Sequence, residues 1–428
     1  MATSTRRLVS RRAAPVRQLW QDAPLAFPTT RMSPPRHHGP LIAILVGQLS
    51  FGLLAMTICL PSMQQWGAIF GSSQAAVQLT FSGYVLAYGG LQLLYGPLSD
   101  RLGRKRILML GLALGGLGSL AAALAGDIAT LTAARVLQGA GCAAGMVIGR
   151  AMVQDLFKGP ERTRVMAYIG MAMGLCPPLA TILGGQLHER LGWQANFALM
   201  ALMALVLFIA AWRALPDTRP ATEPQQAHWL REMASSYAQL ARAPGFLLYV
   251  AILAMTTATF YAFLAGAPMV LGNYGVGPAG MGYYIMFVPL SYILGNFLTT
   301  RLVHRLGERA VMRVGQGSTM LGIGLMLVLA LAGVDKPLAL AAPLVLLGMG
   351  HGLLVPPTLI GTVGLLPALA GAAAAVAGLA QQVMGAVGGF VVGLVPHNGA
   401  ANLGWLMLGL SAGAAVAMAL LQRRPAQG

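Results

Sequence analysis

Long apolar runs recur along the whole chain, and this pattern constrains the fold more than any other feature of the sequence. A helix needs about 20 residues to cross the hydrocarbon core of a bilayer, so each run has the length of one transmembrane helix. Twelve runs can be marked, mostly separated by short connections. They lie at residues 40–62, 75–98, 107–125, 128–149, 165–187, 194–212, 246–269, 279–300, 311–333, 338–361, 371–395 and 402–421.

The composition excludes a soluble protein. Of the 428 residues, 57% are hydrophobic and only 9% are charged, which leaves too few polar side chains to cover a water-exposed surface. The runs lack the polar stripe of an amphipathic surface helix, and they lack the alternation of β-barrel strands. Cys59, Cys142 and Cys176 all fall inside runs, where packed or lipid-facing thiols are expected rather than disulfides. The sequence predicts an all-α membrane protein.

The position of the basic residues predicts the orientation of the chain. A formal net charge of +17 would suit a nucleic-acid-binding protein, so the distribution of charge decides between the two explanations. An even number of spans places both termini on the same side. If that side is the cytoplasm, all but four of the 28 Lys and Arg residues are cytoplasmic; the exceptions are Arg190, Lys336, Arg135 and Arg150. This is the positive-inside distribution, so we expect cytoplasmic termini and no nucleic-acid partner.

Charge is concentrated directly after the second run, in GPLSDRLGRKR (96–106). The basic residues hold the flanking spans at the cytoplasmic face, while Gly96 allows close helix approach and Gly103 allows a tight turn. Asp100 can lie near a positive helix N-terminus. Arg305-Leu306-Gly307 repeats Arg101-Leu102-Gly103 after 204 residues, which indicates two related halves. The residues expected to form a conformational latch are Gly96, Asp100, Arg101, Gly103, Arg104 and Lys105.

Three motifs resemble those of the major facilitator superfamily. GPLSDRLGRK (96–105) resembles its signature loop, and LTAARVLQGAG (131–141) resembles its motif with a buried arginine. The fifth span resembles the motif associated with antiporters. The resemblance implies twelve transmembrane helices in two six-helix pseudo-repeats, with a substrate site near the midplane between them. The antiporter-motif residues are Gly170, Gly174, Pro177, Pro178, Gly184 and Gly185.

Five regions follow from this architecture. We expect a disordered basic tail at 1–39, an N-terminal six-helix bundle at 40–213 and a cytoplasmic linker at 214–245. A C-terminal six-helix bundle at 246–421 and a short tail at 422–428 complete the chain. Within the linker, residues 227–242 are expected to form a surface helix. Met1 and Met32 are both open as the translation start.

Further segments resemble the bicyclomycin- and chloramphenicol-resistance branch of drug:proton antiporters. They are RAMVQDLF (150–157), LPDT (215–218), GHGLLVPP (350–357) and Pro367 followed by Ala370-Gly371. This implies export of antibiotic-like compounds in exchange for protons. One position departs from the branch: its first span usually carries an Asp shortly before a Leu-Pro pair, and here Thr57 occupies that position. No Asp or Glu lies deep in a predicted span, so proton coupling is left open.

Arg135 is expected to have a functional role inside the fourth span. An arginine near the centre of a membrane helix costs roughly 2.5–3.5 kcal/mol on insertion scales. We expect it to face a cavity and to bond with Gln138 or with a polar group of the first span such as Gln48. The alternative is that its side chain extends outward to the membrane surface.

Three residues are candidates for proton coupling. His351 is the only histidine deep in a predicted span; it either carries a proton or contacts substrate, or it is a neutral imidazole bonded to a neighbouring helix. Asp155 lies near Arg150, and a structural ion pair between them is the favoured interpretation. Asp100 is interfacial, which favours a latch over proton transfer.

Polar and aromatic side chains are the candidates for lining a substrate cavity. Tyr84, Tyr88 and Gln92 recur every four residues and so share one helix face. Aromatic residues suit a site for greasy compounds, but they also serve as packing and as interfacial belts, and both roles stay open. The cavity candidates are Thr57, Tyr84, Tyr88, Gln92, Arg135, Gln138, Phe260, Tyr261, Tyr284, His351 and Gln381.

The sequence points to transport rather than catalysis. It contains no phosphate-binding loop, no metal-spaced His/Cys set and no carboxylate pair, so we expect no enzyme activity, cofactor or metal. The leading hypothesis is a monomeric secondary exporter of small amphipathic compounds in the bacterial inner membrane, driven by protons through alternating access. The alternatives are uptake or exchange of a metabolite and, less favoured, a non-transporting sensor. Substrate identity and stoichiometry stay open.

Overall fold

The computed structural model describes residues 39–218, 229–366, 369–397 and 399–423. Nearly all of these residues are helical, and none of them lies in a β-strand. Among them, eleven helical segments are long and apolar enough to cross a membrane. The expected N-terminal tail, both candidate start residues and Pro367 lie outside the described residues, apart from Gly39 at the end of the tail.

Within the described residues, the first half contains six spans. The first is broken after Thr57 and resumes at Leu60, where Pro61 in the first turn has no N–H to continue the preceding helix. Together these two pieces cover Gly39–Ile69. The helices are α1 (Gly39–Thr57), α2 (Leu60–Ile69), α3 (Gln74–Leu102), α4 (Arg104–Ala123), α5 (Ile128–Leu156), α6 (Gly159–Leu191) and α7 (Gln194–Ala214).

The described part of the second half also contains six spans. They are preceded by α8 (Trp229–Ala241), which lies where a surface helix was predicted in the linker. Two of the spans are broken, covering Pro278–Leu306 and Pro337–Gly364. The helices are α9 (Pro244–Asn273), α10 (Pro278–Ile285), α11 (Phe287–Leu306), α12 (Glu308–Leu331), α13 (Pro337–Ala341), α14 (Val345–Gly364), α15 (Ala370–Val392) and α16 (Ala400–Gln422).

Helix α3 is the twelfth span, although it is less apolar than the other eleven. Its length of 29 residues is sufficient for a crossing. The side chains of Gln78, Tyr84 and Tyr88 lower its hydropathy, and all three are buried inside the protein. A membrane helix can carry such groups because they face neighbouring helices rather than lipid. The prediction of twelve transmembrane helices is therefore confirmed.

The two halves repeat each other in three dimensions. Gly103 ends α3 with φ of +100°, and Gly307 ends α11 with φ of +77°, a backbone region that strongly favours glycine. Gly184 in α6 lies against the backbone between α1 and α2, and Gly388 in α15 lies in the same way against α9. The repeat read from the sequence therefore extends to helix packing.

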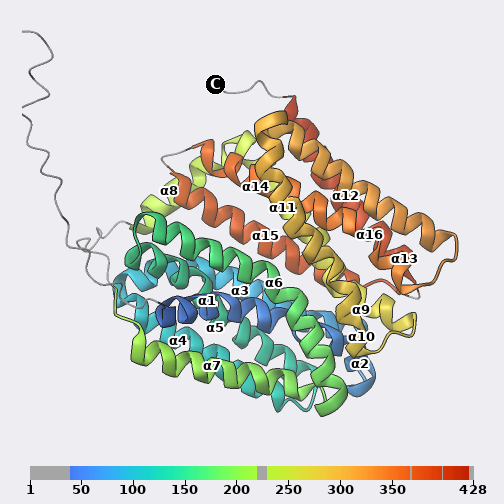
Figure 1. Cartoon of the computed structure of the whole chain (residues 1–428), viewed down its shortest axis with the longest axis horizontal. Coiled ribbons are helices and arrows are strands. Elements are labelled where there is room, and N and C mark those ends of the chain that lie inside the picture. Colours follow the sequence, from blue (N-terminus) through green and yellow to red (C-terminus); the bar gives the residue numbers. More distant parts are fainter. Residues whose placement is uncertain (1–38, 219–228, 367–368, 398, 424–428) are drawn as a thin grey trace, which may run out of the picture. The chain divides into compact units, whose positions relative to one another are not determined.

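The turn from α3 to α4 at Gly103 and the turn from α11 to α12 at Gly307 define what we call the basic end of the bundle. Helices α2 and α10 lie at the opposite end (Figure 1). The connections from α2 to α3, from α9 to α10 and from α15 to α16 define the opposite end, called the distal end. The halves contact each other through α3 with α15, α6 with α10 and α2 with α9. At the distal end, Gly185 lies against Pro278 and Gly393 lies against Ala75.

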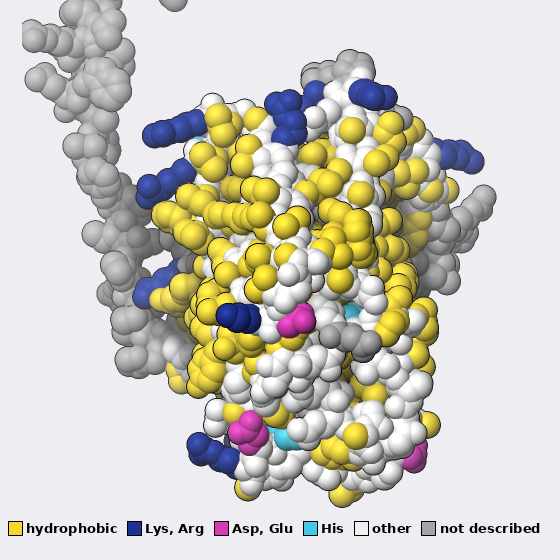
Figure 2. All heavy atoms as spheres, turned by 90° about the vertical axis from the view of Figure 1, so that its right-hand side faces the viewer, with side chains coloured by type: hydrophobic (Ala, Val, Ile, Leu, Met, Phe, Trp, Pro, Cys, Tyr) yellow, Lys and Arg dark blue, Asp and Glu magenta, His cyan; other side chains and the backbone are white. Residues whose placement is uncertain are grey.

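The outer surface of the helices is apolar. Leucines on several helices are largely exposed, including Leu117, Leu179 and Leu331. Figure 2 shows hydrophobic side chains over much of one face, with basic side chains mostly toward its upper part. An exposed apolar surface of this extent is expected where lipid replaces water as the solvent.

Candidate functional site

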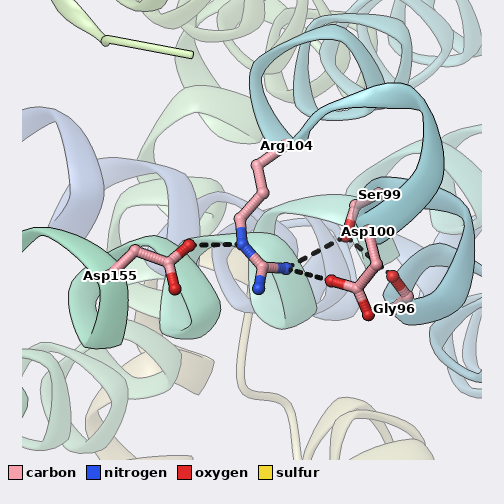
Figure 3. A network of polar contacts seen from close by, with 5 residues as sticks. All are labelled: Gly96, Ser99, Asp100, Arg104 and Asp155. Carbon is pink, nitrogen blue, oxygen red and sulfur yellow. Dashed lines mark hydrogen bonds and ion pairs between the residues drawn. The ribbon is translucent and has the colours of Figure 1, made fainter. Parts of the chain in front are cut away.

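A network of polar contacts at the basic end is centred on Arg104, the first residue of α4 (Figure 3). Its Nε donates to Oδ2 of Asp155 at 2.5 Å, and its Nη1 lies 2.9 Å from Oδ1 of Asp100. Nη1 also donates to Oγ of Ser99 at 3.2 Å, which in turn donates to the carbonyl of Gly96. The network joins the end of α3, the start of α4 and the end of α5.

The expected ion pair between Asp155 and Arg150 was wrong. Residues five apart on a helix point to different sides, whereas partners on one face are three or four apart. Arg150 is exposed, and its Nη2 lies 3.6 Å from Sδ of Met173 in α6. Asp155 pairs instead with Arg104 from the next helix.

Two further latch residues extend this network toward α7. A Cβ at Gly103 would lie 3.0 Å from Oδ1 of Asp217, so glycine leaves room for that carboxylate. Lys105 donates through Nζ to the carbonyl of Trp212 at 2.7 Å. Arg101 lies in the last turn of α3 and is exposed. Asp217 was not among the predicted site residues, although it lies in the LPDT segment.

Arg135 lies inside the first half, completely buried. Its Nη1 donates to the carbonyl of Ala55 at 2.8 Å and to Oε1 of Gln138, whose Nε2 donates to Oγ of Ser119. The first-span partner is thus a backbone carbonyl. Gln48, the partner considered from the sequence, donates to a carbonyl of α7 instead. The side chain does not reach outward to a membrane surface.

Aromatic rings surround the Arg135 guanidinium. The guanidinium carbon lies 4.3 Å from the ring centre of Tyr84, a cation–π geometry. Tyr84 stacks on Tyr88 with 5.9 Å between ring centres, and its Oη donates to the carbonyl of Gly52. Nε and Nη2 of Arg135 and Oη of Tyr88 find no hydrogen-bond partner among the described residues. Buried polar groups are normally paired, and these three atoms are exceptions to that rule.

The aromatic cluster continues into the second half. Oη of Tyr261 in α9 donates to Oε1 of Gln382 in α15 at 3.1 Å. The Tyr261 ring meets the ring of Phe81 in α3 edge to face at 5.8 Å. Gly89 in α3 lies directly against Gln382, with no room for a Cβ. Side chains of α3, α9 and α15 therefore meet where the halves join.

Glycine spacing directs His351 toward this cluster. In α14, Gly348 and Gly352 lie against α11, and Gly350 lies against α12. His351 is left to face α9, where its ring meets Phe260 edge to face at 6.3 Å. It is 3% exposed, and its ring nitrogens make no hydrogen bond to a described residue. We call the set Arg135, Tyr84, Tyr88, Phe81, Tyr261, Gln382, Phe260 and His351 the central layer.

The remaining predicted cavity residues have less specific positions. Thr57 is fully buried at the end of α1, and its Oγ1 donates to the carbonyl of Leu53 at 2.8 Å. Gln92 and Gln381 are partly buried on α3 and α15, which contact each other. Tyr284 is partly buried on α10 and packs against the main hydrophobic core. Gln382 was missed from the site, although its neighbour Gln381 was included.

Helix α6 carries the antiporter-like motif and contacts both halves. Gly184 faces the backbone between α1 and α2, whereas Gly185 faces α10 and Gly174 faces α11. The missing side chains let the backbone of α6 approach Ile58 and Pro278 closely and leave room for the Ile293 side chain. The other motif members, Gly170, Pro177 and Pro178, lie in the same helix.

A cavity of about 720 Å³ lies at the distal end and is lined by residues of both halves. Its polar lining includes the side-chain amides of α2 and α3 and the segment after α15. The lining also includes Gln65, Gly277, Pro278 and His397. Within the described ranges, no group of three or more His, Cys, Asp or Glu residues could hold a metal ion.

Comparison with known proteins agrees with this architecture. The family model described as Major Facilitator Superfamily matches residues 31–389. A chloramphenicol resistance protein of Pseudomonas aeruginosa is 28% identical, with 84% of this chain and 86% of that protein covered. Multidrug resistance protein D of Escherichia coli is also 28% identical, with 86% and 92% covered.

A bicyclomycin resistance protein homolog of Haemophilus influenzae is 30% identical, with 62% of this chain and 68% of that protein covered. Among solved structures, a D-xylose-proton symporter superposes with a TM-score of 0.73 at 14% identity, covering 91% of this chain and 98% of that one, which supports the fold alone. The match over most of the chain, together with the repeated six-helix halves, shows that this protein belongs to the Major Facilitator Superfamily.

Proposed function

We propose that the protein is a secondary exporter of small amphipathic, antibiotic-like compounds across the bacterial inner membrane. It works by alternating access and proton antiport, as a monomer with both termini in the cytoplasm. The named relatives support drug export, and the distribution of basic residues supports the orientation. In this orientation the basic end is cytoplasmic and the distal end faces outward.

The central layer is the observation that carries this proposal. It combines flat aromatic surface with a few polar atoms, the composition expected of a site for amphipathic ligands. The buried Nε and Nη2 of Arg135 and Oη of Tyr88 are free to orient a ligand acceptor. Because the layer includes α3 from one half and α9 and α15 from the other, relative movement of the halves would rearrange it.

We place the proton-carrying role at His351. Asp100 and Asp155 both contact Arg104 at the basic end, where they serve a latch better than a carrier that reaches both faces. His351 lies in the central layer, and an imidazole can bind and release a proton. The Thr57 hydroxyl, by contrast, is not a titratable group, and it is fully buried.

An accumulation assay in an efflux-deficient bacterial host tests the function. Cells expressing the protein should hold less chloramphenicol or bicyclomycin than vector controls, and an uncoupler should abolish the difference. Equal accumulation at verified membrane expression would argue against export of these compounds. Higher accumulation than in vector controls would favour uptake.

A pair of tyrosine variants tests the site itself. Tyr88→Phe removes the hydroxyl that has no partner among the described residues and keeps the ring, so it should change the compound profile while the protein stays stable. Tyr84→Phe is the matched control, because it removes a hydroxyl already bonded to Gly52 and should mainly lower stability. An unchanged compound profile in Tyr88→Phe would remove this hydroxyl from the site.

A further inference from the structure

Helix α10 begins the eighth span without a capping side chain of its own. Its N-cap residue is Gly277, which cannot accept a hydrogen bond through a side chain, and Pro278 follows as the first helical residue. The first N–H groups of a helix have no partner within it and normally need a side-chain acceptor. The chain therefore has to satisfy this helix start from elsewhere.

Glu189 from the other half supplies the missing acceptor. Its Oε1 accepts a hydrogen bond from the N–H of Ala279 at 2.9 Å. A Cβ built on Gly277 would lie 3.1 Å from the same oxygen, so the carboxylate occupies the place of the absent capping side chain. Gly185, four residues earlier on α6, lies on the same helix face and touches Pro278.

The groups next to Glu189 are engaged within their own half or exposed. The ring nitrogens of His188 lie 2.7 Å from Oγ of Ser62 and 2.9 Å from Oε1 of Gln65, both on α2. Arg190 is exposed, and Glu189 forms no ion pair with any described residue. The carboxylate thus meets the partial positive charge of the α10 N-terminus, an interaction that favours an anion.

We propose that Glu189 is a positioning residue for the transport cycle, holding the distal end closed by capping α10 across the two halves. The contact exists only while α6 and α10 touch, so its free energy enters the equilibrium between closed and open distal ends. It adds nothing to the folding of either half alone. This inference rests on the alternating access of the proposed function, and it assigns the closing contact to one carboxylate.

The test measures the distance between the halves in the purified full-length protein without substrate. Spin labels are attached through Leu191→Cys at the end of α6 and Tyr283→Cys in α10, both exposed positions, after replacement of the three native cysteines. Pulsed electron resonance then gives the populations of short and long distances. Glu189→Ala should raise the ratio of open to closed roughly fivefold, and Glu189→Gln should raise it less because its amide oxygen can still accept.

Asp127→Ala is the matched control. Asp127 caps α5 at the same end through the N–H groups of Ala129 and Thr130, all within one half. Its loss should lower thermal stability and leave the distance populations unchanged. An unshifted distribution in folded Glu189→Ala would overturn the proposal, and so would an equal shift in Asp127→Ala. If Glu189→Ala does not fold, the milder Glu189→Gln decides on the same criterion.

The readout separates this proposal from the proposed function. Distances are measured without any compound, so failure to export chloramphenicol would leave the Glu189 result standing. A shifted distance distribution together with no export of any compound would contradict the exporter assignment alone.

Discussion

Replacing Arg135 by lysine should separate transport from stability. The guanidinium is completely buried, with Nη1 bonded to Ala55 and Gln138 and with Nε and Nη2 unpartnered among the described residues. Lysine keeps the charge but has a single donor atom in place of the planar fork. The lysine ammonium can make the hydrogen bonds that Nη1 makes to Ala55 and Gln138. The substitution removes Nε and Nη2, the two donors that we propose a ligand uses.

The contacts of Arg135 set the expected size of the effect on compound affinity and on protein stability. A hydrogen bond to a charged group contributes about 1.5–3 kcal/mol, so loss of one to the ligand lowers affinity roughly 10- to 100-fold. Stability should change much less. Lysine loses part of the cation–π contact with Tyr84, worth up to about 2 kcal/mol when desolvated. It also removes two unpaired buried donors, each costing about 1–3 kcal/mol, which offsets that loss.

The assay compares compound binding, export and thermal unfolding for Arg135→Lys with those for Arg150→Lys. Arg150 lies in the same helix but is exposed, so its lysine variant should resemble the parent in all three measurements. We expect Arg135→Lys to unfold near the parent temperature while binding compound at least tenfold more weakly. Parent-like export by Arg135→Lys would refute the ligand role of these donors.

Three further predictions concern the latch, the proton carrier and the distal end. In distance measurements, Asp155→Asn should shift the populations of inward- and outward-facing protein more than Asp100→Asn does. The reason is that the Asp155 side chain is 28% exposed and the Asp100 side chain is 52% exposed. The reverse order would count against the latch geometry. His351→Gln should bind compound in proteoliposomes but fail to move it against a gradient driven by ΔpH, and retained coupling would make the imidazole structural. Burial lowers the pKa of His397 in the folded protein. As the pH falls, His397 therefore takes up a proton in the unfolded chain at a higher pH than in the folded protein, so stability should fall below about pH 6.5. In His397→Gln the unfolding temperature should decrease less between about pH 7 and 5 than in the parent protein. An unchanged decrease would exclude this histidine as its source.

The membrane spans could be predicted from the sequence because their cause is local. Each apolar run must satisfy its own backbone in lipid, and only a helix does this within one segment. The turn at Gly103 was predictable for the same reason, since a positive φ is a property of one residue. The length of its run predicted even α3, although Gln78 and the buried tyrosines of this helix make it less apolar than the other spans.

Contacts between distant segments could not be predicted in the same way. Arg104 and Asp155 are 51 residues apart, and Glu189 and Ala279 are 90 residues apart. The sequence identified Asp155 as important but assigned it to Arg150, a neighbour along the chain that points to another side of the helix. Glu189 gave no signal, because its role depends on the absence of a side chain at Gly277 in the other half.

Proton-driven movement of a compound by the purified protein is the decisive measurement for proton antiport. The protein is reconstituted in liposomes, a pH gradient is imposed, and radiolabelled chloramphenicol is followed. We expect the compound to accumulate in liposomes with an acidic interior, and we expect an uncoupler to abolish this accumulation. His351→Gln should not support it. Accumulation that is independent of the gradient, or that requires an alkaline interior, would contradict proton antiport.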